Sequence, residues 1–247
     1  MGTRAVLVRF LKRYPPLYRL TAKIYYALAP YHLLGIFVGT KAQEGRWARK
    51  SIAEGYWENQ NHPSKRFLAD KIAGFLPFSS ILEVGCASGP NLYLMAKRFP
   101  QAELTGIDIN AAAVEYGNRQ LTKEGISNVK LLEGKADELE RFPDSSFDIV
   151  FTNALLIYIG PDKIEETIKN MLRISRSALV LMECYCFEPS KDVNGMGVYY
   201  GGIWIRDYAA LLKQFVPEEQ IRVNRIPEDI WPGEPWASFG AVIEVAK

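Results

Sequence analysis

The chain has 247 residues, 48% hydrophobic and 23% charged, as in an ordinary globular protein with one large α/β domain or one domain and an appended segment. The net charge of +2 is uneven, because residues 1–50 contain ten Lys or Arg and the single acid Glu44, whereas the remainder contains 20 basic and 27 acidic residues. The three cysteines lack CxxC spacing, which argues against a zinc site or a disulfide framework and favours a reducing, cytoplasmic compartment.

Residues 1–50 are predicted to form a basic, aromatic helical extension without the features of a secretory signal. The longest uncharged run, residues 24–40, is shorter than the ~20 residues of a spanning helix and contains Pro30. A helix at the membrane surface would place tyrosines at the headgroups and Arg or Lys against anionic lipid, so residues 1–40 are a candidate for binding the inner membrane face. The alternatives are packing on the domain or on a second subunit of a homodimer.

Residues 51–186 alternate strand and helix patterns. Pro63 opens the first helical pattern, and Asn110 is well placed to cap a later one. Strands are expected at residues 79–85, 102–109, 128–134, 146–153 and 178–185, and helices at 63–76, 90–99, 111–125 and 162–174. Short apolar strands separated by helices of this length predict a parallel sheet with right-handed crossovers.

The C-terminal part of the chain, residues 187–247, has a different pattern. Residues 187–204 are rich in glycine and aromatic side chains and are expected to form a loop. A helix is expected at residues 206–215, followed by strands at 219–227 and 237–245 that a Pro/Trp-rich connection joins. Such a pair predicts a hairpin that completes the sheet with an antiparallel strand.

The sequence ILEVGCASGPNL, at residues 81–92, predicts a strand that turns sharply into a helix. Ligands of open α/β sheets bind beyond the carboxyl ends of the strands, and Gly85 and Gly89 would let the backbone approach such a ligand closely. The G-x-G-x-x-G fingerprint of dinucleotide sites fits poorly, because Ala87 and Pro90 stand where it needs glycine. A P-loop is excluded, because no Gly-Lys-Ser/Thr follows.

The pattern E-x-G-x-x-x-G resembles motif I of the class I S-adenosylmethionine-dependent methyltransferases, with Ala87 where many members have glycine. Three further segments match the family in order at successive strand ends: GIDIN, EGKADEL and FDIVFTNALLIYI. The resemblance implies a Rossmann-like, doubly wound, mostly parallel seven-stranded sheet with an antiparallel C-terminal strand. It also implies that residues 51–247 form the S-adenosylmethionine-binding domain, behind the helical extension at residues 1–50.

The resemblance further implies which residues contact S-adenosylmethionine. Glu83 would bind the methionyl ammonium, and Asp108 would bind the ribose hydroxyls. Asp137 and the backbone amide of Ala136 would bind the adenine. Asn153 would lie beside the sulfonium. Trp57 is a candidate on a segment that covers the cofactor, or alternatively part of an ordinary amphipathic helix. The complete set of expected cofactor contacts is Glu83, Gly85, Cys86, Ala87, Gly89, Asp108, Ile109, Ala136, Asp137, Asn153 and Trp57.

Candidates for the acceptor side are less specific. Methyl transfer requires an aligned acceptor and in some cases a proton acceptor, for which Glu183, Tyr158 and His62 are the candidates. Each also has an ordinary interpretation, as a strand-end ion pair or a loop residue. Within an insert at about residues 187–210, the candidates for substrate binding are Tyr199, Tyr200, Trp204 and Arg206, unless this segment is a packed lid without substrate contact.

The sequence therefore predicts a methyltransferase that acts on a small-molecule or lipid-linked acceptor, such as a glycan or glycolipid, with oxygen as the preferred atom. Methylation of nucleic-acid bases is disfavoured, because the segment after the fourth strand reads TNALL and lacks the Asn/Asp-Pro-Pro-Tyr/Phe loop of those enzymes. No cluster of residues at ligand spacing indicates a metal. The alternatives are an NAD(P)-binding oxidoreductase and a non-catalytic scaffold that keeps the fold.

Overall fold

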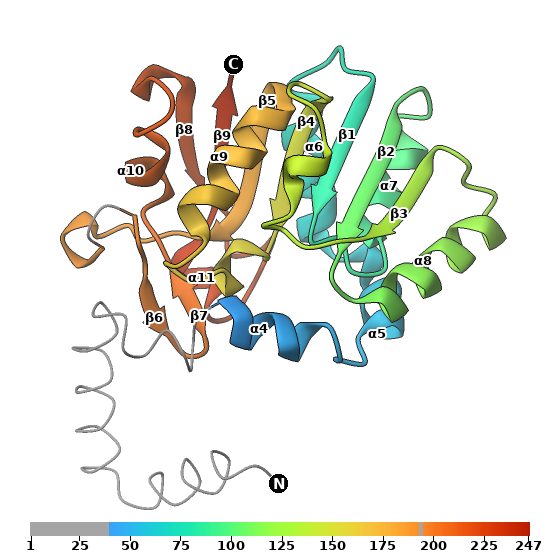
Figure 1. Ribbon diagram of the computed structural model, residues 1–247, viewed down its shortest axis with the longest axis horizontal. Helices are drawn as coiled ribbons and strands as arrows, with labels where there is room; N and C mark the ends of the chain where they lie inside the picture. The colour runs from blue at the N-terminus through green and yellow to red at the C-terminus, as the bar shows by residue number, and fades with distance from the viewer. Residues whose placement is uncertain (1–39, 193–194) are drawn as a thin grey trace, which may run out of the picture.

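The computed structural model describes residues 40–192 and 195–247 (Figure 1). Its centre is a seven-stranded sheet with the order β3-β2-β1-β4-β5-β9-β8. All neighbouring strands pair in parallel except β9, which is antiparallel to both β5 and β8. The strands are β1 (Ser80–Val84), β2 (Glu103–Asp108), β3 (Val129–Glu133), β4 (Phe147–Asn153), β5 (Ser175–Cys184), β8 (Ile221–Arg225) and β9 (Gly240–Ala246). This is the predicted doubly wound sheet.

Helices cover both faces of the sheet, because its central strands are apolar on both sides. In β1, Ile81 packs in the cluster that includes residues of α6, α7 and α8, whereas Leu82 and Val84 pack with residues of α9 and α10. The helices are α4 (Thr40–Trp47), α5 (Ala53–Glu58), α6 (Pro63–Ala73), α7 (Pro90–Arg98), α8 (Ala111–Lys123), α9 (Ile164–Ile174), α10 (Tyr208–Leu212) and α11 (Trp236–Phe239).

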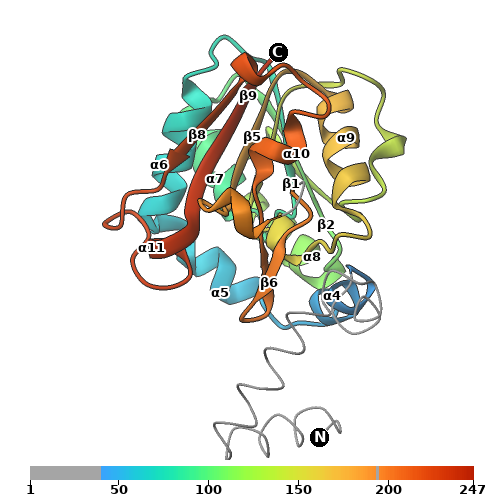
Figure 2. The same cartoon turned by 90° about the vertical axis from the view of Figure 1, so that its left-hand side faces the viewer.

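The strand order places a crevice at one end of the sheet. The chain runs outward from β1 through β2 to β3 and then returns to β4 on the other side of β1. The connections after β1 and β4 therefore diverge, and a crevice opens beyond the carboxyl ends of these strands, where ligands of such sheets bind. In Figures 1 and 2, α4, α5 and the tip of β6 and β7 lie at this same end of the molecule.

Two local expectations for the C-terminal part are wrong. The segment expected to be a loop contains a hairpin of β6 (Val198–Tyr200) and β7 (Ile203–Ile205), which the pair Gly201 and Gly202 joins in left-handed backbone conformations. The last strand begins at Gly240, because residues 236–239 form α11 instead. The other expected strands are present, with ends displaced by at most three residues.

The N-terminal predictions fall only partly on described residues. Residues 1–39, which include nearly all of the candidate membrane-binding segment, lie outside the described part of the chain. Residues 40–50, the end of the predicted extension, contain α4. Among the described residues, no helix combines the length and the apolar character needed to cross a bilayer.

Candidate active site

A cleft lies at the carboxyl ends of β1, β2 and β4, below α4. It encloses about 760 Å³, counting the space at its open mouth, within the range of small-molecule sites. Seven residues predicted from the sequence line it: Gly85, Ala87, Asp108, Ile109, Ala136, Asp137 and Asn153. Tyr158, predicted for the acceptor side, lines it too. Segments that are far apart in the sequence thus form one site.

The turn between β1 and α7 forms the floor of the cleft. Gly85 has a φ of 79°, and a Cβ atom built on it would lie 2.8 Å from a methyl carbon of Leu155, so only glycine fits. Ala87 has a φ of 48°, the left-handed conformation that glycine adopts readily. The departure from the family pattern at this position therefore keeps the shape of the turn, at a cost of roughly 1–2 kcal/mol for the methyl group.

Asp108 ends β2 at the edge of this turn. Its Oδ2 accepts a hydrogen bond from the Ala87 amide at 2.8 Å, and its Oδ1 accepts one from the Asn110 amide at 2.8 Å. These bonds fix the carboxylate against the cleft. Burial raises its pKa above the ordinary value, although the two amides act in the opposite direction. A carboxylate held in this way can accept hydrogen bonds from vicinal hydroxyl groups such as those of a ribose.

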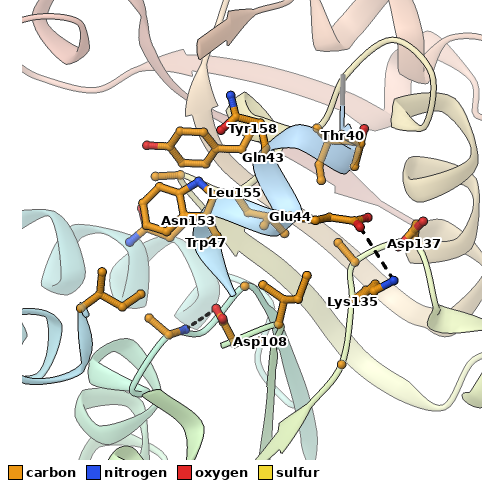
Figure 3. A pocket seen from close by; sticks show the side chains of 18 of the residues that line it. Thr40, Gln43, Glu44, Trp47, Asp108, Lys135, Asp137, Asn153, Leu155 and Tyr158 are labelled. Carbon is orange, nitrogen blue, oxygen red and sulfur yellow. Dashed lines mark hydrogen bonds and ion pairs between the residues drawn. The ribbon is translucent and has the colours of Figure 1, made fainter. Parts of the chain in front are cut away.

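Asp137 lies on the opposite side of the cleft, after β3. Lys163 is 3.6 Å from its Oδ2, and the neighbouring Lys135 is 3.8 Å from Glu44 on α4 (Figure 3). The Asp137 side chain is 14% exposed and lines the cleft, so it retains access to a ligand. Glu44 and Lys135 both belong to the lining, and their ion pair joins α4 to the segment after β3.

A chain of buried polar side chains connects the cleft to the interior. Asn91 donates from Nδ2 to Oε1 of Glu83 at 2.6 Å, and its Oδ1 lies 3.5 Å from Nδ2 of Asn153 and 3.4 Å from Nζ of Lys65. Two oxygens of this chain, Glu83 Oε2 and Asn153 Oδ1, are buried without a hydrogen-bond partner. Desolvation raises the pKa of Glu83 to about 8. The Asn153 oxygen, at the lining of the cleft, requires a donor, and the ammonium group of a bound amino acid is a suitable one.

The helix α4 crosses the cleft and contributes residues that were not foreseen. At its start, Thr40 Oγ1 bonds to Asp162 Oδ1 at 3.0 Å and accepts from the Gly160 amide at 2.9 Å. At its end, Asn110 Nδ2 donates to the carbonyl oxygens of Trp47 and Lys50 at 2.9 and 2.8 Å. We call residues 40–50 the strap, because its two ends are bonded to opposite walls of the cleft.

The inner side of the strap is lined with side chains that could bind a ligand. Gln43 and Trp47 line the cleft, and Gln43 Oε1 and Trp47 Nε1 are buried without partners. The Trp47 ring packs on Tyr158 at 4.7 Å between centroids, beside Asn153 (Figure 3). The lining residues missed by the sequence are Thr40, Gln43, Glu44, Trp47, Ile52, Tyr56, Gly134, Lys135, Ala154, Leu155 and Ile159. The single tryptophan in the polar stretch TKAQEGRW was the one available signal.

Comparisons with known proteins agree with this geometry. The model of a methyltransferase domain family matches residues 81–178, which contain all four of the motifs that line the cleft. Residues 81–178 are a methyltransferase domain of the class I, S-adenosylmethionine-dependent type. The orphaned oxygen of Asn153 and the carboxylate of Asp108, which both line the cleft, fit the ammonium and ribose of this family's cofactor.

The curated relatives match less than half of this chain, whereas a solved structure matches most of its fold. A malonyl-[acyl-carrier protein] O-methyltransferase of Priestia megaterium is 27% identical over 46% of this chain and 36% of its own length. A tRNA (guanine-N(7)-)-methyltransferase of Porphyromonas gingivalis is 39% identical over 25% of each chain. A solved phosphoethanolamine N-methyltransferase of Haemonchus contortus has a TM-score of 0.57 at 19% identity, over 84% of this chain and 48% of its own. The chain thus spans about a quarter to a third of these curated relatives, whose acceptors differ.

Four residues predicted to contact the cofactor are not in the cleft lining, and neither is His62. Glu83 and Cys86 are buried, the former reaching the lining only through Asn91. Gly89 begins α7 as its N-cap, and Trp57 packs on Tyr93, while the neighbouring Tyr56 lines the cleft. His62 caps α6 through Nδ1, and its ring packs on Trp231.

Glu183 and Arg206 occupy positions that differ from those expected. Both are fully buried and absent from the cleft lining. Glu183 accepts hydrogen bonds from Thr152 Oγ1 and the amides of Leu155 and Ile157. The Arg206 guanidinium donates to the carbonyl oxygens of Leu156, Ile159 and Met196. Both side chains therefore use their hydrogen bonds on the protein itself. They hold the turn at Leu156–Tyr158 that follows β4, which is a correction to the expected roles.

The remaining substrate candidates belong to the β6–β7 hairpin. Tyr199 and Trp204 are buried and pack on each other at 5.0 Å between ring centroids, and Tyr200 is 55% exposed. None of these three residues lines the cleft in the described part of the chain. Their role in acceptor binding stays a prediction.

Proposed function

We propose that this protein transfers a methyl group from S-adenosylmethionine to an oxygen atom of a small-molecule or lipid-linked acceptor. One observation carries the proposal: residues from four family motifs, which follow four successive strands, meet in a single cleft. A structural corner without a ligand would not require buried acceptor oxygens without donors beside it.

The chain's own residues divide the cleft between the parts of the cofactor. Asp108 would accept hydrogen bonds from the ribose hydroxyls, and Asp137 would receive the adenine amino group. Asn153 would hold the ammonium, with Glu83 connected to it through Asn91. When bound, S-adenosylmethionine supplies an electrophilic methyl group on its sulfonium. The strap excludes water from the cofactor side, because α4 covers it from wall to wall.

Tyr158, Trp47 and Asn153 mark the acceptor side of the cleft (Figure 3). Burial raises the pKa of Tyr158 to about 12, so at neutral pH its phenol keeps its proton and donates a hydrogen bond rather than accepting a proton. Glu183 and His62 do not line the cleft, and so do not serve as bases there. This arrangement favours an acceptor oxygen that is already deprotonated, such as a carboxylate, which Tyr158 can orient.

Binding measurements test the cofactor assignment. Isothermal titration calorimetry is expected to detect binding of S-adenosylhomocysteine and no binding of NADH. Asp108→Asn is expected to weaken the binding of S-adenosylhomocysteine at least tenfold, because the substitution removes one strong, charged hydrogen-bond acceptor. Asp144→Asn, a matched change at an exposed acid on Arg173 remote from the cleft, should leave the affinity unchanged. Binding of NADH without S-adenosylhomocysteine would instead support the oxidoreductase alternative.

Transfer of a labelled methyl group tests the activity itself. The protein is incubated with methyl-labelled S-adenosylmethionine and an extract separated into lipid, glycan and small-molecule fractions. Label is expected in one of these fractions, released by mild alkali as an ester would be, and absent with Asp108→Asn. Cofactor binding without transfer to any fraction would favour the non-catalytic scaffold.

A further inference from the structure

The strap combines two kinds of side chain. Four of its residues line the cleft: Thr40, Gln43, Glu44 and Trp47. Four others are exposed cations, Lys41, Arg46, Arg49 and Lys50, which we call the basic face. Within residues 40–192 and 195–247, no ion pair joins any of the four to an acid. The acid of the strap, Glu44, is turned inward to Lys135.

Exposed tyrosines lie on elements at the same end of the molecule as the strap. Tyr56 on α5 is 40% exposed and lines the cleft at the same time. Tyr200, next to the tip of the β6–β7 hairpin, is 55% exposed. The strap, α5 and this hairpin lie at one end of the molecule in both views (Figures 1 and 2). Tyrosines beside cations are typical of surfaces that reach the headgroup region of a bilayer.

The charge around the strap extends into the preceding chain. Residues 1–39 contain six Lys or Arg and no acid, and they lead directly into Thr40. Two exposed acids on α5, Glu54 and Glu58, reduce the charge of the described part, so the four cations of the basic face leave a balance of +2 there. The six cations of residues 1–39 add to this excess in the sequence, while the rest of the chain is acidic.

We infer that the basic face of the strap docks on an anionic lipid surface, with Tyr56 and Tyr200 at the headgroups. Docking in this orientation turns the mouth of the cleft toward the bilayer. A lipid-linked acceptor would then reach Tyr158 without leaving the membrane; this consequence rests on the proposed function, whereas the docking itself does not. Cations and exposed tyrosines would also suit single-stranded RNA, whose bases stack on aromatic rings. We favour lipid, because the segment after β4 reads TNALL and lacks the loop of base-methylating enzymes.

Vesicle binding by the full chain tests this inference. Sedimentation is measured with vesicles of phosphatidylcholine alone and with 30% phosphatidylglycerol, at roughly 0.1 M salt, where charges act over about 10 Å. The triple variant Lys41→Gln/Arg46→Gln/Arg49→Gln is expected to weaken binding to the anionic vesicles roughly 100-fold. Each cation contributes about 1 kcal/mol to the binding free energy, and about 1.4 kcal/mol corresponds to a tenfold change in affinity. Lys50 is left intact, because its ammonium packs over the Trp47 ring at 4.0 Å.

A matched variant separates location from total charge. Lys123→Gln/Lys130→Gln removes exposed cations at the end of α8 and the start of β3, the opposite end of the parallel strands, and should retain binding. An environment-sensitive fluorophore at Tyr200→Cys should shift to the blue on anionic vesicles, and one at Lys130→Cys should not. The three native cysteines are buried, which favours labelling of the introduced ones.

The outcomes separate this inference from the proposed function. Unchanged vesicle binding by the triple variant overturns the inference. The inference also fails, in favour of RNA, if the triple variant loses binding to a single-stranded RNA oligonucleotide but still binds vesicles. S-adenosylhomocysteine affinity, measured in the same preparations, should be equal in the wild type and both variants. If vesicle binding depends on the basic face but no cofactor binds, the docking surface stands and the proposed methyltransferase activity fails.

Discussion

Two buried charged residues of opposite sign, Glu183 and Arg206, hold the backbone that presents Tyr158 to the cleft. Glu183 accepts from amides of the turn after β4, and Arg206 donates to its carbonyl oxygens. A short turn cannot satisfy its own backbone groups, so buried side chains must bond to them. Their charges are therefore needed for positioning rather than for contact with an acceptor.

Replacing Arg206 should destabilise the fold. Arg206→Met leaves three buried carbonyl oxygens without donors, and we expect the free energy of unfolding to fall by at least about 3 kcal/mol. Urea unfolding followed by circular dichroism measures this, with Arg222→Met at an exposed position as the control. A stable Arg206→Met protein that has lost only acceptor affinity would restore the substrate-binding role.

Glu183 should make stability depend on pH. Burial raises its pKa to about 7 in the folded protein from an ordinary 4.5, so between these values the folded state binds more protons than the unfolded state. Its contribution is fully present below pH 4.5 and is lost as the pH rises through 7. The loss is on the order of 3 kcal/mol at most.

The test compares the free energies of unfolding at pH 5 and pH 7.5. The decrease should be smaller in Glu183→Gln than in the wild type. Glu83, with a pKa of about 8, also makes stability fall as the pH rises, and over a wider pH range. Because Glu83 is present in both proteins, the difference between their decreases reports Glu183 alone. Glu188→Gln, at an exposed position, is the control, and an equal decrease in all three proteins would contradict the assignment.

At the scale of elements, α4 gains its order from tertiary bonds rather than from its own sequence. An eight-residue helix is too short to be stable alone in water, and only a few of its residues meet the cleft. Thr40 at one end and Asn110 at the other bond it to the domain. Such an element can open and close at a small free-energy cost, which exchange of a covered cofactor requires.

Weakening one end of the strap should therefore loosen it without unfolding the domain. Thr40→Val removes the two hydrogen bonds of the hydroxyl group, to Asp162 and Gly160, each contributing about 1 kcal/mol, and keeps the bond from the backbone amide to Asp162. It should speed amide hydrogen exchange of residues 40–47 and dissociation of S-adenosylhomocysteine several-fold. Thr122→Val, whose hydroxyl bonds only within α8, is the matched control. Unchanged exchange in Thr40→Val would mean that the strap is held elsewhere.

The elements also show where sequence patterns lose information. The strands of the parallel sheet were predicted within a few residues, because buried strands produce continuous apolar runs. The β6–β7 hairpin was missed, because its three-residue strands are too short for a period and its turn glycines indicate a loop equally well. The strap was placed in a separate extension, because nothing local in TKAQEGRW indicates what lies beneath it.

At the scale of the whole molecule, the cofactor and the acceptor would be bound by different but overlapping parts of the fold. The segment shared with relatives, residues 81–178, includes β1 to β4 and the cofactor side of the cleft. The strap and the C-terminal hairpin lie outside that segment. The proposed acceptor side draws on both, with Asn153 and Tyr158 from within residues 81–178 and Trp47 from the strap.

The sequence by itself determined the sheet, the family and the cofactor side of the cleft. Those depend on local patterns, namely apolar runs, glycines in a tight turn, and acids at strand ends, and parallel strands bring their carboxyl ends together in any such fold. Only the tertiary structure decided which buried charges face the cleft and which bond to backbone. Glu183, Arg206 and the residues of the strap could not be assigned from the sequence, because side-chain burial and partners depend on contacts between segments that are distant in the sequence, from Glu183 and Thr152 to Thr40 and Asp162.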